Sequence, residues 1–363
     1  MNTVTGPSQA SAVWLVAERE ISSKLRSKAF MISTGILLLI ALVGVLIGGF
    51  TSASPQPDTV AATSQTASVA QSLSNVEVTE VADRAAAEEL VTSDEAVAAI
   101  VPGDESGFGF VVLAKENAPD DLLMQLSQMP TVEILQPADT NPFVRYIVAL
   151  GFGLVFLMAA STFGGTIAQS VVEEKQTRVV ELLISAIPTR VLLAGKVLGN
   201  TVLAMGQILL LAAIAVVGLI VTGQDELLNG IGAPILWFAV FFLFGFILLA
   251  SLYAAAASMV SRQEDIGSTT MPLMMLVMLP YFLVIFFNDN PVVLTILSYV
   301  PFSAPVGMPM RLFVGEAQWW EAVLSLIILI ASCVGAIWIG AKIYQNSLLR
   351  MGARVTLGEA LRG

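Results

Sequence analysis

The side chains best suited to binding chemistry lie between two apolar runs, in residues 171–199. Charged residues gather in the first half of this segment: Glu173, Glu174, Lys175, Arg178 and Glu181. On one continuous helix, Arg178 can pair with Glu174 four residues before it and with Glu181 three residues after it. Leu182 and Leu183 follow within an apolar cluster. This pattern predicts a short amphipathic helix that docks on another surface, and it does not resemble a catalytic centre.

A predicted helix break separates this cluster from the next apolar run. Pro188 ends the first helix because proline has no backbone N–H to donate, and Lys196 lies where a second helix enters the apolar run. Apolar residues on a polar connection indicate a partner or a lipid surface. The alternative is an ordinary juxtamembrane helix whose ion pairs satisfy one another.

The composition excludes several kinds of catalytic site. The 363-residue chain has no histidine, which removes the usual general base near pH 7 and histidine metal sites, and Cys333 is its only cysteine. The pair Gly195–Lys196 lacks the upstream glycine of a phosphate-binding loop and is followed by Val197 rather than Ser or Thr. We therefore expect no catalytic residue, no metal site and no ATP hydrolysis by this chain alone.

Long apolar runs account for the unusual composition. Hydrophobic residues make up 56% of the chain and charged residues 12%, whereas a soluble domain has roughly 25% charged residues. About 20 apolar residues are needed for a helix to cross roughly 30 Å of hydrocarbon. Runs of about this length are residues 30–50, 147–169, 197–222, 234–260, 271–287 and 322–343. The sequence thus predicts an α-helical polytopic membrane protein with about six transmembrane helices.

The distribution of Lys and Arg predicts the orientation of these spans. With a cytoplasmic N-terminus, only Arg84, Lys115, Arg145 and Arg311 fall outside, and the other cations fall on cytoplasmic segments. Both termini are then cytoplasmic. The predicted divisions are a cytoplasmic N-terminus (1–29), a first span (30–50), an extracytoplasmic segment (51–146), five further spans (147–343) and a cytoplasmic tail (344–363).

The extracytoplasmic segment is acidic and compositionally distinct. Acidic residues between Asp58 and Asp139 account for much of the net charge of −11, which argues against nucleic-acid binding. Residues 51–74 are rich in Ser, Thr, Ala, Gln and Pro and are predicted to form a flexible linker. A small α/β domain should follow, with strands at 76–81, 108–113 and 131–135 and helices at 83–91, 93–99 and 119–128. Its acids do not have EF-hand spacing, which favours a solvated surface over a calcium site.

The segment before the first span is predicted to be a helix over residues 11–28. Its apolar residues recur at steps of three and four: Trp14, Ala17, Ile21 and Leu25. Such a helix can lie in the membrane interface, or it can simply extend the first span. Gly195 and Gly199 have the GxxxG spacing that lets helices approach closely, although glycine is common enough in membrane helices for this to arise by chance.

A proline-rich stretch, residues 298–313, follows the fifth apolar run. It contains Pro301, Pro305, Pro309 and Arg311, and it is too interrupted to span a membrane yet too apolar for a free loop. Either a re-entrant segment or an interfacial loop fits this pattern.

The run EEKQTRVVELLISAIPTRVLLAGKVLG resembles a motif of ABC-2 type transporter permeases, and more closely their NatB-like, sodium-efflux-type branch. AEREISSKLRSKAF, DEAVAAIVPGD, YVPFSAPVGMPMRL and ARVTLGEALR extend the resemblance over nearly the whole chain. It implies the transmembrane fold of type-2 ABC exporters. It also implies that residues 171–196 contain the coupling helix that docks into a separate ATPase subunit. The residues carried over are Glu173, Glu174, Lys175, Arg178, Glu181, Leu182 and Leu183, framed by Pro188 and Lys196.

The resemblance further implies a re-entrant segment at 298–313, a second permease chain, identical or related, and a bacterial cytoplasmic (inner) membrane. ATP and magnesium are expected on the partner ATPase, and membrane lipid around the spans. The expected function is export of a small ion such as sodium, a drug or a lipid-like substrate. The alternatives are an ATP-independent secondary carrier or channel, and a membrane scaffold or sensor whose extracytoplasmic domain binds a ligand.

Overall fold

The computed structural model describes residues 8–53, 58–103, 109–115, 120–126, 142–177, 179–350 and 355–362. The chain divides into two compact units. Unit 1 comprises Met1–Gly49 and Ala138–Gly363, and unit 2 comprises Phe50–Pro137. Each unit is described by itself.

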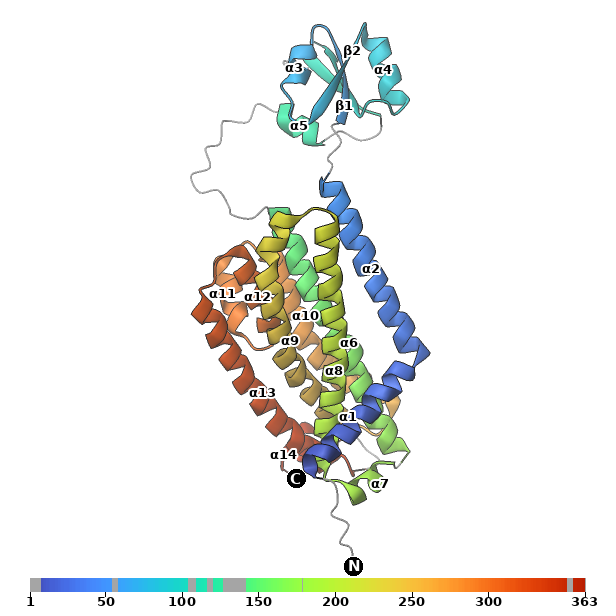
Figure 1. Ribbon diagram of the computed structural model, residues 1–363, viewed down its shortest axis with the longest axis vertical. Helices are drawn as coiled ribbons and strands as arrows, with labels where there is room; N and C mark the ends of the chain where they lie inside the picture. The colour runs from blue at the N-terminus through green and yellow to red at the C-terminus, as the bar shows by residue number, and fades with distance from the viewer. Residues whose placement is uncertain are drawn as a thin grey trace, which may run out of the picture. The chain divides into compact units, whose positions relative to one another are not determined.

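Helices build the described part of unit 1 (Figure 1). In chain order they are α1 (Gln9–Arg26), α2 (Lys28–Ala53), α6 (Pro142–Gln176), α7 (Val179–Ala186), α8 (Thr189–Val221), α9 (Asp225–Ser258), the 3₁₀ turn η1 (Gln263–Asp265), α10 (Ile266–Phe286), α11 (Pro291–Tyr299), α12 (Ala304–Val314), α13 (Trp319–Ser347) and α14 (Leu357–Arg362). Among the described residues, 6 helices are long and apolar enough to cross a membrane, namely α2, α6, α8, α9, α10 and α13. The predicted number of spans is confirmed.

The spanning helices are longer than the apolar runs that predicted them. α6 continues to Gln176 and α8 begins at Thr189, so charged side chains that were assigned to a connection belong to these helices. The backbone hydrogen-bond ladder does not stop where hydrocarbon stops, and only the apolar part of each helix is visible in composition. Residues 171–196 comprise the end of α6, the short helix α7 and the start of α8, and the helix break predicted at Pro188 is confirmed.

Helix α9 forms the centre of unit 1 and packs against α6, α8, α12 and α13. Aromatic rings join it to α6 along its length. The ring centroids of Phe152 and Phe238 lie 4.8 Å apart, and those of Phe163 and Phe246 lie 6.0 Å apart. Buried aromatic contacts of this kind keep the two helices in register.

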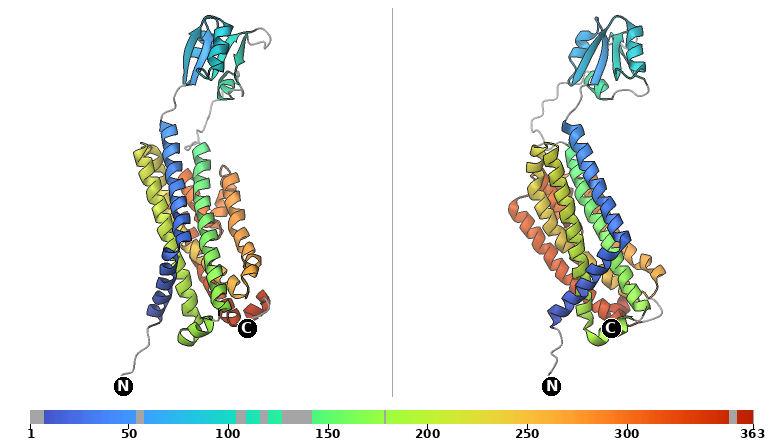
Figure 2. Two further views of the ribbon diagram at one scale, coloured as in Figure 1. Left: turned by 90° about the vertical axis from the view of Figure 1, so that its right-hand side faces the viewer. Right: turned by 45° about the vertical axis from the view of Figure 1, so that its right-hand side comes forward.

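Helix α1 lies across the N-terminal part of α8, where two glycines face it (Figures 1 and 2). A Cβ atom at Gly199 would stand 2.9 Å from the carbonyl oxygen of Ala17, and one at Gly195 would stand 2.9 Å from that of Val13. The GxxxG spacing thus permits contact between α8 and the N-terminal helix. As a result α1 has one face on α8, while Trp14 and Leu25 on the other face are exposed.

The proline-rich stretch forms two short helices joined by a turn. Pro301 lies in the turn between α11 and α12, and Pro305 occupies the first turn of α12. Pro309 lies inside α12, which continues through it. Nearly all of α12 is buried, mainly against α9. The stretch is a packed helical pair rather than a loop, and whether it is re-entrant stays a prediction.

Unit 2 contains a four-stranded sheet with strand order β2-β1-β3-β4. Its described elements are β1 (Asp58–Thr63), α3 (Ala67–Gln71), β2 (Val76–Val81), α4 (Arg84–Thr92), β3 (Ala98–Pro102), β4 (Phe110–Leu113) and α5 (Asp120–Leu126). β1 pairs in parallel with β2 and β3, and β3 pairs antiparallel with β4. Residues of α3 and α5 pack on one face of the sheet, and residues of α4 pack on the other.

Two predictions within residues 51–146 are wrong. The linker at 51–74 contains β1, whose Val60, Ala61 and Ala62 are fully buried, and α3. The helix predicted at 93–99 overlaps the start of β3, in which Ala98 and Ala99 are fully buried. Both errors have one cause: alanine favours helices by propensity and weakens the hydrophobic signal, yet its small side chain fits a central strand covered on both faces. The strand predicted at 131–135 lies outside the described residues.

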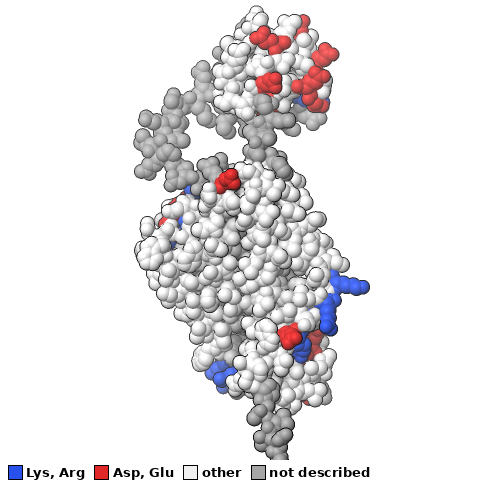
Figure 3. Space-filling view, viewed as in Figure 1, with Lys and Arg blue, Asp and Glu red and all other residues white. Residues whose placement is uncertain are grey.

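Charged residues avoid the middle of unit 1. On the face drawn in Figure 3, the middle of unit 1 is free of charge, and Lys and Arg gather toward the end that holds α1. Helices α1, α7 and α14 all lie at this end (Figures 1 and 2). The arrangement fits one membrane-crossing band between two charged ends.

Candidate functional site

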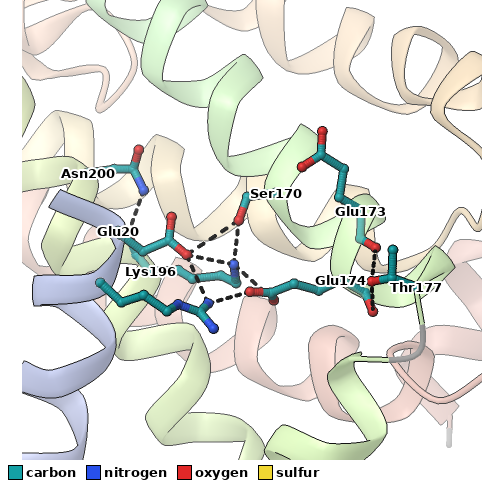
Figure 4. A network of polar contacts seen from close by, with 8 residues as sticks. Glu20, Ser170, Glu173, Glu174, Thr177, Lys196 and Asn200 are labelled. Atoms are coloured by element: carbon teal, nitrogen blue, oxygen red, sulfur yellow. Dashed lines mark hydrogen bonds and ion pairs between the residues drawn. The ribbon is translucent and has the colours of Figure 1, made fainter. Parts of the chain in front are cut away.

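Two carboxylates and two cations meet where the end of α6 approaches α1 and α8 (Figure 4). Lys196 of α8 donates from Nζ to Oε1 of Glu20 at 2.9 Å, and the same nitrogen lies 3.0 Å from Oε2 of Glu174 on α6. Arg19 of α1 donates to Glu20 at 3.3 Å and also to Glu174. The four charges cancel in this group, which we call the ion cluster.

Hydrogen bonds extend the ion cluster along the contact between α6 and α8. Ser170 stands one turn before Glu174 on α6 and accepts a hydrogen bond of 2.6 Å from Nζ of Lys196. Asn200, one turn after Lys196, donates to the Lys196 carbonyl oxygen at 2.9 Å and bonds Thr166 at 3.2 Å. The four-residue spacing places these polar side chains on the facing sides of two helices.

Lys196 is fully buried, and Glu20 is nearly so. Burial alone raises the pKa of the Glu20 carboxyl, but the charges and hydrogen bonds of Lys196 and then Arg19 outweigh burial and hold the pKa below its ordinary value. Glu20 is therefore ionised near neutral pH. The ion cluster can fix α1, α6 and α8 relative to one another.

Lys175, the residue after Glu174, joins α6 to two other helices. It is fully buried and donates from Nζ to the carbonyl oxygens of Ser258 at 2.7 Å and Ser347 at 3.0 Å. Ser258 ends α9 and Ser347 ends α13, so the ammonium group satisfies carbonyls at two helix C-termini, where positive charge is favourable. The end of α6 is thus tied to α1, α8, α9 and α13 at once.

Helix α7 itself has one buried and one exposed side. Val180 is fully buried, and Leu183 is half-buried against the core of unit 1. Leu182 is 73% exposed, and Glu181 and Pro188 are also exposed. The structure therefore separates the two leucines of the predicted docking surface: Leu183 holds α7 in place, and Leu182 is the one available to a partner.

The predicted ion-pair ladder stays a prediction at its centre. Its central residue, Arg178, lies outside the described residues, and α6 ends at Gln176 before the ladder could continue. Glu174 pairs with Arg19 and Lys196 instead. Glu173 is exposed and accepts a hydrogen bond of 3.5 Å from Gln263 of η1, the turn that precedes α10.

Sequence reasoning missed Arg19, Glu20 and Ser170. One signal was present for Glu20, because it lies three residues after Ala17, on the side of α1 that meets α8. An acidic residue on a buried helix face needs a cation, and Lys196 is a cation inside an apolar helix. Nothing in a single sequence showed that these two residues meet.

A second polar group lies around Arg311 at the other end of unit 1. Arg311 is buried and donates to Ser298 at 3.1 Å, to the Glu316 carbonyl oxygen at 3.1 Å and to Glu321 at 3.0 Å. Tyr299 donates to Glu321 at 3.1 Å. Arg311 thus joins α11, α12 and α13, and the neighbouring Pro301, Pro305 and Pro309 shape the helix pair without contributing donors.

The described residues contain no group of three or more His, Cys, Asp or Glu side chains that could hold a metal ion. What they define is a polytopic helical membrane protein with a polar junction at one end of its spans. The chain belongs to the ABC-2 family of transporter proteins, whose family model matches residues 28–342.

Two curated relatives are themselves uncharacterized. Protein MJ1024 of Methanocaldococcus jannaschii is 28% identical over 227 residues, which are 62% of this chain and 55% of the relative. Protein YhaP of Bacillus subtilis is 28% identical over 231 residues, 58% of this chain and 55% of the relative. The matches thus span about half the length of these relatives. No solved structure matches.

Proposed function

We propose that this chain is the permease subunit of an ATP-driven ABC exporter and that α7 is its coupling helix. The observation that carries the proposal is the combination of an exposed Leu182 on α7 with the Glu174–Lys196 ion pair, which joins the helices that precede and follow α7. Family membership supports a permease role in an ABC transporter.

The attachment gives α7 a physical route to the membrane region. The Glu174–Lys196 ion pair joins the end of α6 to the start of α8 on either side of α7. Lys175 joins the same end of α6 to α9 and α13. A push on α7 would therefore move several spans together, since buried ion pairs and hydrogen bonds resist separation more than exposed ones do.

The same proposal assigns the other parts. ATP and magnesium belong to a separate ATPase subunit, and a second permease chain, identical or related, completes the pathway. Both termini and α7 face the cytoplasm of a bacterial inner membrane, and unit 2 is an extracytoplasmic α/β domain. The NatB-like branch, with a small ion such as sodium as substrate, is supported by the sequence motifs, and a drug or lipid-like substrate fits the apolar spans equally well.

The test is co-purification of an ABC-type ATPase subunit with this chain, compared between two leucine variants. Leu182→Asp should abolish or strongly weaken association because it charges the exposed docking position. Leu349→Asp is the matched control, since Leu349 is also exposed, at 54%, and lies at the same end of unit 1. Equal association of both variants with the ATPase would refute α7 as the coupling helix. Absence of any ATPase from the wild-type complex would favour a secondary carrier, channel or sensor instead.

A further inference from the structure

Three cations lie at the junction of α1 and α2, which we call the basic elbow: Lys24, Arg26 and Lys28. Lys24 and Arg26 belong to the last turn of α1, Ser27 links the helices, and Lys28 begins α2. Arg26 and Lys28 are exposed, and Lys24 is half-buried.

The basic elbow differs from the other cations at this end of unit 1. Lys175 and Lys196 are buried, and their ammonium groups donate hydrogen bonds to oxygen atoms inside unit 1. Arg19 pairs with two carboxylates of the ion cluster. None of the ion pairs between described residues includes Lys24, Arg26 or Lys28. Three neighbouring positive charges thus face the surface without a protein counter-charge among the described residues.

Apolar surface adjoins the basic elbow on both helices. On α1, Leu25 is 50% exposed. On α2, Met31 and Ile32 are exposed within four residues of Lys28. Cations at the end of an apolar helix are typical of the level of lipid headgroups. Glu18 on the outer face of α1 is the one nearby exposed acid on that helix, and it leaves the elbow with a net positive charge.

We propose that the basic elbow binds the headgroup of an anionic phospholipid, whose acyl chains lie along the exposed apolar side of α2. The phosphate supplies the missing counter-charge, and the adjoining apolar residues favour a lipid over a soluble phosphate. Juxtamembrane cations attract anionic lipids in this way, each by roughly fivefold in affinity. The inference rests on the proposed membrane insertion but not on ATPase docking, so either can fail without the other.

The experiment measures lipid preference directly on the full chain in detergent by native mass spectrometry. Phosphatidylglycerol and phosphatidylcholine are titrated separately, and the ratio of their dissociation constants is compared between variants. The elbow variant is Lys24→Gln/Arg26→Gln/Lys28→Gln. The matched control removes three exposed cations elsewhere at this end of unit 1: Lys342→Gln/Arg350→Gln/Arg362→Gln.

Wild type and the control should prefer phosphatidylglycerol by about tenfold or more, and the elbow variant should bind both lipids alike. The preference should shrink as ionic strength rises, because exposed charges are screened. An equal loss in elbow and control variants would overturn the site. Displacement of the lipid by equimolar glycerol phosphate would show a soluble-phosphate site and overturn the lipid assignment. If the triple variant does not fold, Arg26→Gln alone decides: about a fivefold loss supports the proposal, and no loss overturns it.

Discussion

Replacing Lys196 by methionine tests the ion cluster most severely. Methionine fills a similar volume but removes the ammonium group that faces both Glu20 and Glu174. The two carboxylate side chains are only 7% and 13% exposed, so water cannot replace the lost partner. Arg19 alone then faces two buried negative charges.

The magnitude follows from the distances. Two ion pairs near 3 Å correspond to a gross attraction of about 5–6 kcal/mol each at an effective dielectric constant of about 20. Desolvation offsets much of that, and loss of one partner from a buried pair costs about 3–5 kcal/mol. For a unit of this size the thermal midpoint should fall by about 6–20 °C.

The assay is thermal unfolding in detergent, followed by tryptophan fluorescence from pH 7 to pH 4. In the wild type the lowered pKa of Glu20 means that its contribution is present above its ordinary pKa, near 4.5, and is lost as pH falls below that value. In Lys196→Met the sign reverses, because burial now raises the pKa of Glu20 and protonation relieves the unpaired charge. The variant should therefore gain stability over the range in which the wild type begins to lose it.

Lys342→Met is the matched control, because Lys342 is exposed on α13. Glu174→Gln added to Lys196→Met should recover part of the lost stability, since one buried charge is removed. The reasoning is refuted if Lys196→Met and Lys342→Met unfold at the same temperature, or if both show the wild-type pH dependence.

Three further predictions concern α1, α8 and the topology. In the same unfolding assay, the thermal midpoint of the wild type should fall below about pH 4.5, and Glu20→Gln should make that fall smaller. An unchanged pH profile would count against the lowered pKa of Glu20. Gly199→Ala should destabilise the fold by about 1–3 kcal/mol, because its Cβ would press on a carbonyl oxygen of α1. Gly206→Ala on the same helix is the control, because its Cβ would meet open space. Equal unfolding midpoints of the two variants would reject close packing of α1 on α8. Single cysteines can be placed at Ser64 and Leu349, both exposed, in a cysteine-free background. They should react with a membrane-impermeant thiol reagent from opposite sides of the membrane. Labelling of both from the outside would overturn the predicted orientation.

The spanning helices could be predicted because burial in lipid demands long apolar runs, which composition alone displays. The ends of those helices could not, because backbone hydrogen bonding continues past the apolar part. Glu174 illustrates the consequence. Its predicted pair with Arg178 assumed one continuous helix, but α6 ends at Gln176 and Glu174 pairs with residues distant in sequence.

The candidate site was predictable in kind but not in its partners. The apolar cluster of α7 was visible in the sequence, yet only the fold distinguishes the exposed Leu182 from the half-buried Leu183. Lys175 was expected to be part of the docking surface and Lys196 to frame it, and instead both are fully buried within unit 1. In unit 2, β1 was missed because its buried residues include alanines, which carry little strand or hydrophobic signal.

The central claim is that α7 touches the ATPase, and site-directed cross-linking tests it most directly. In a Cys333→Ala background, Leu182→Cys carries a photoreactive reagent while the chain is in complex with its ATPase, and Leu349→Cys serves as the control at the same end of unit 1. We expect a covalent permease–ATPase product from position 182 and little or none from position 349. A product from position 349 alone, or none from position 182 in a complex that still co-purifies, would contradict this claim.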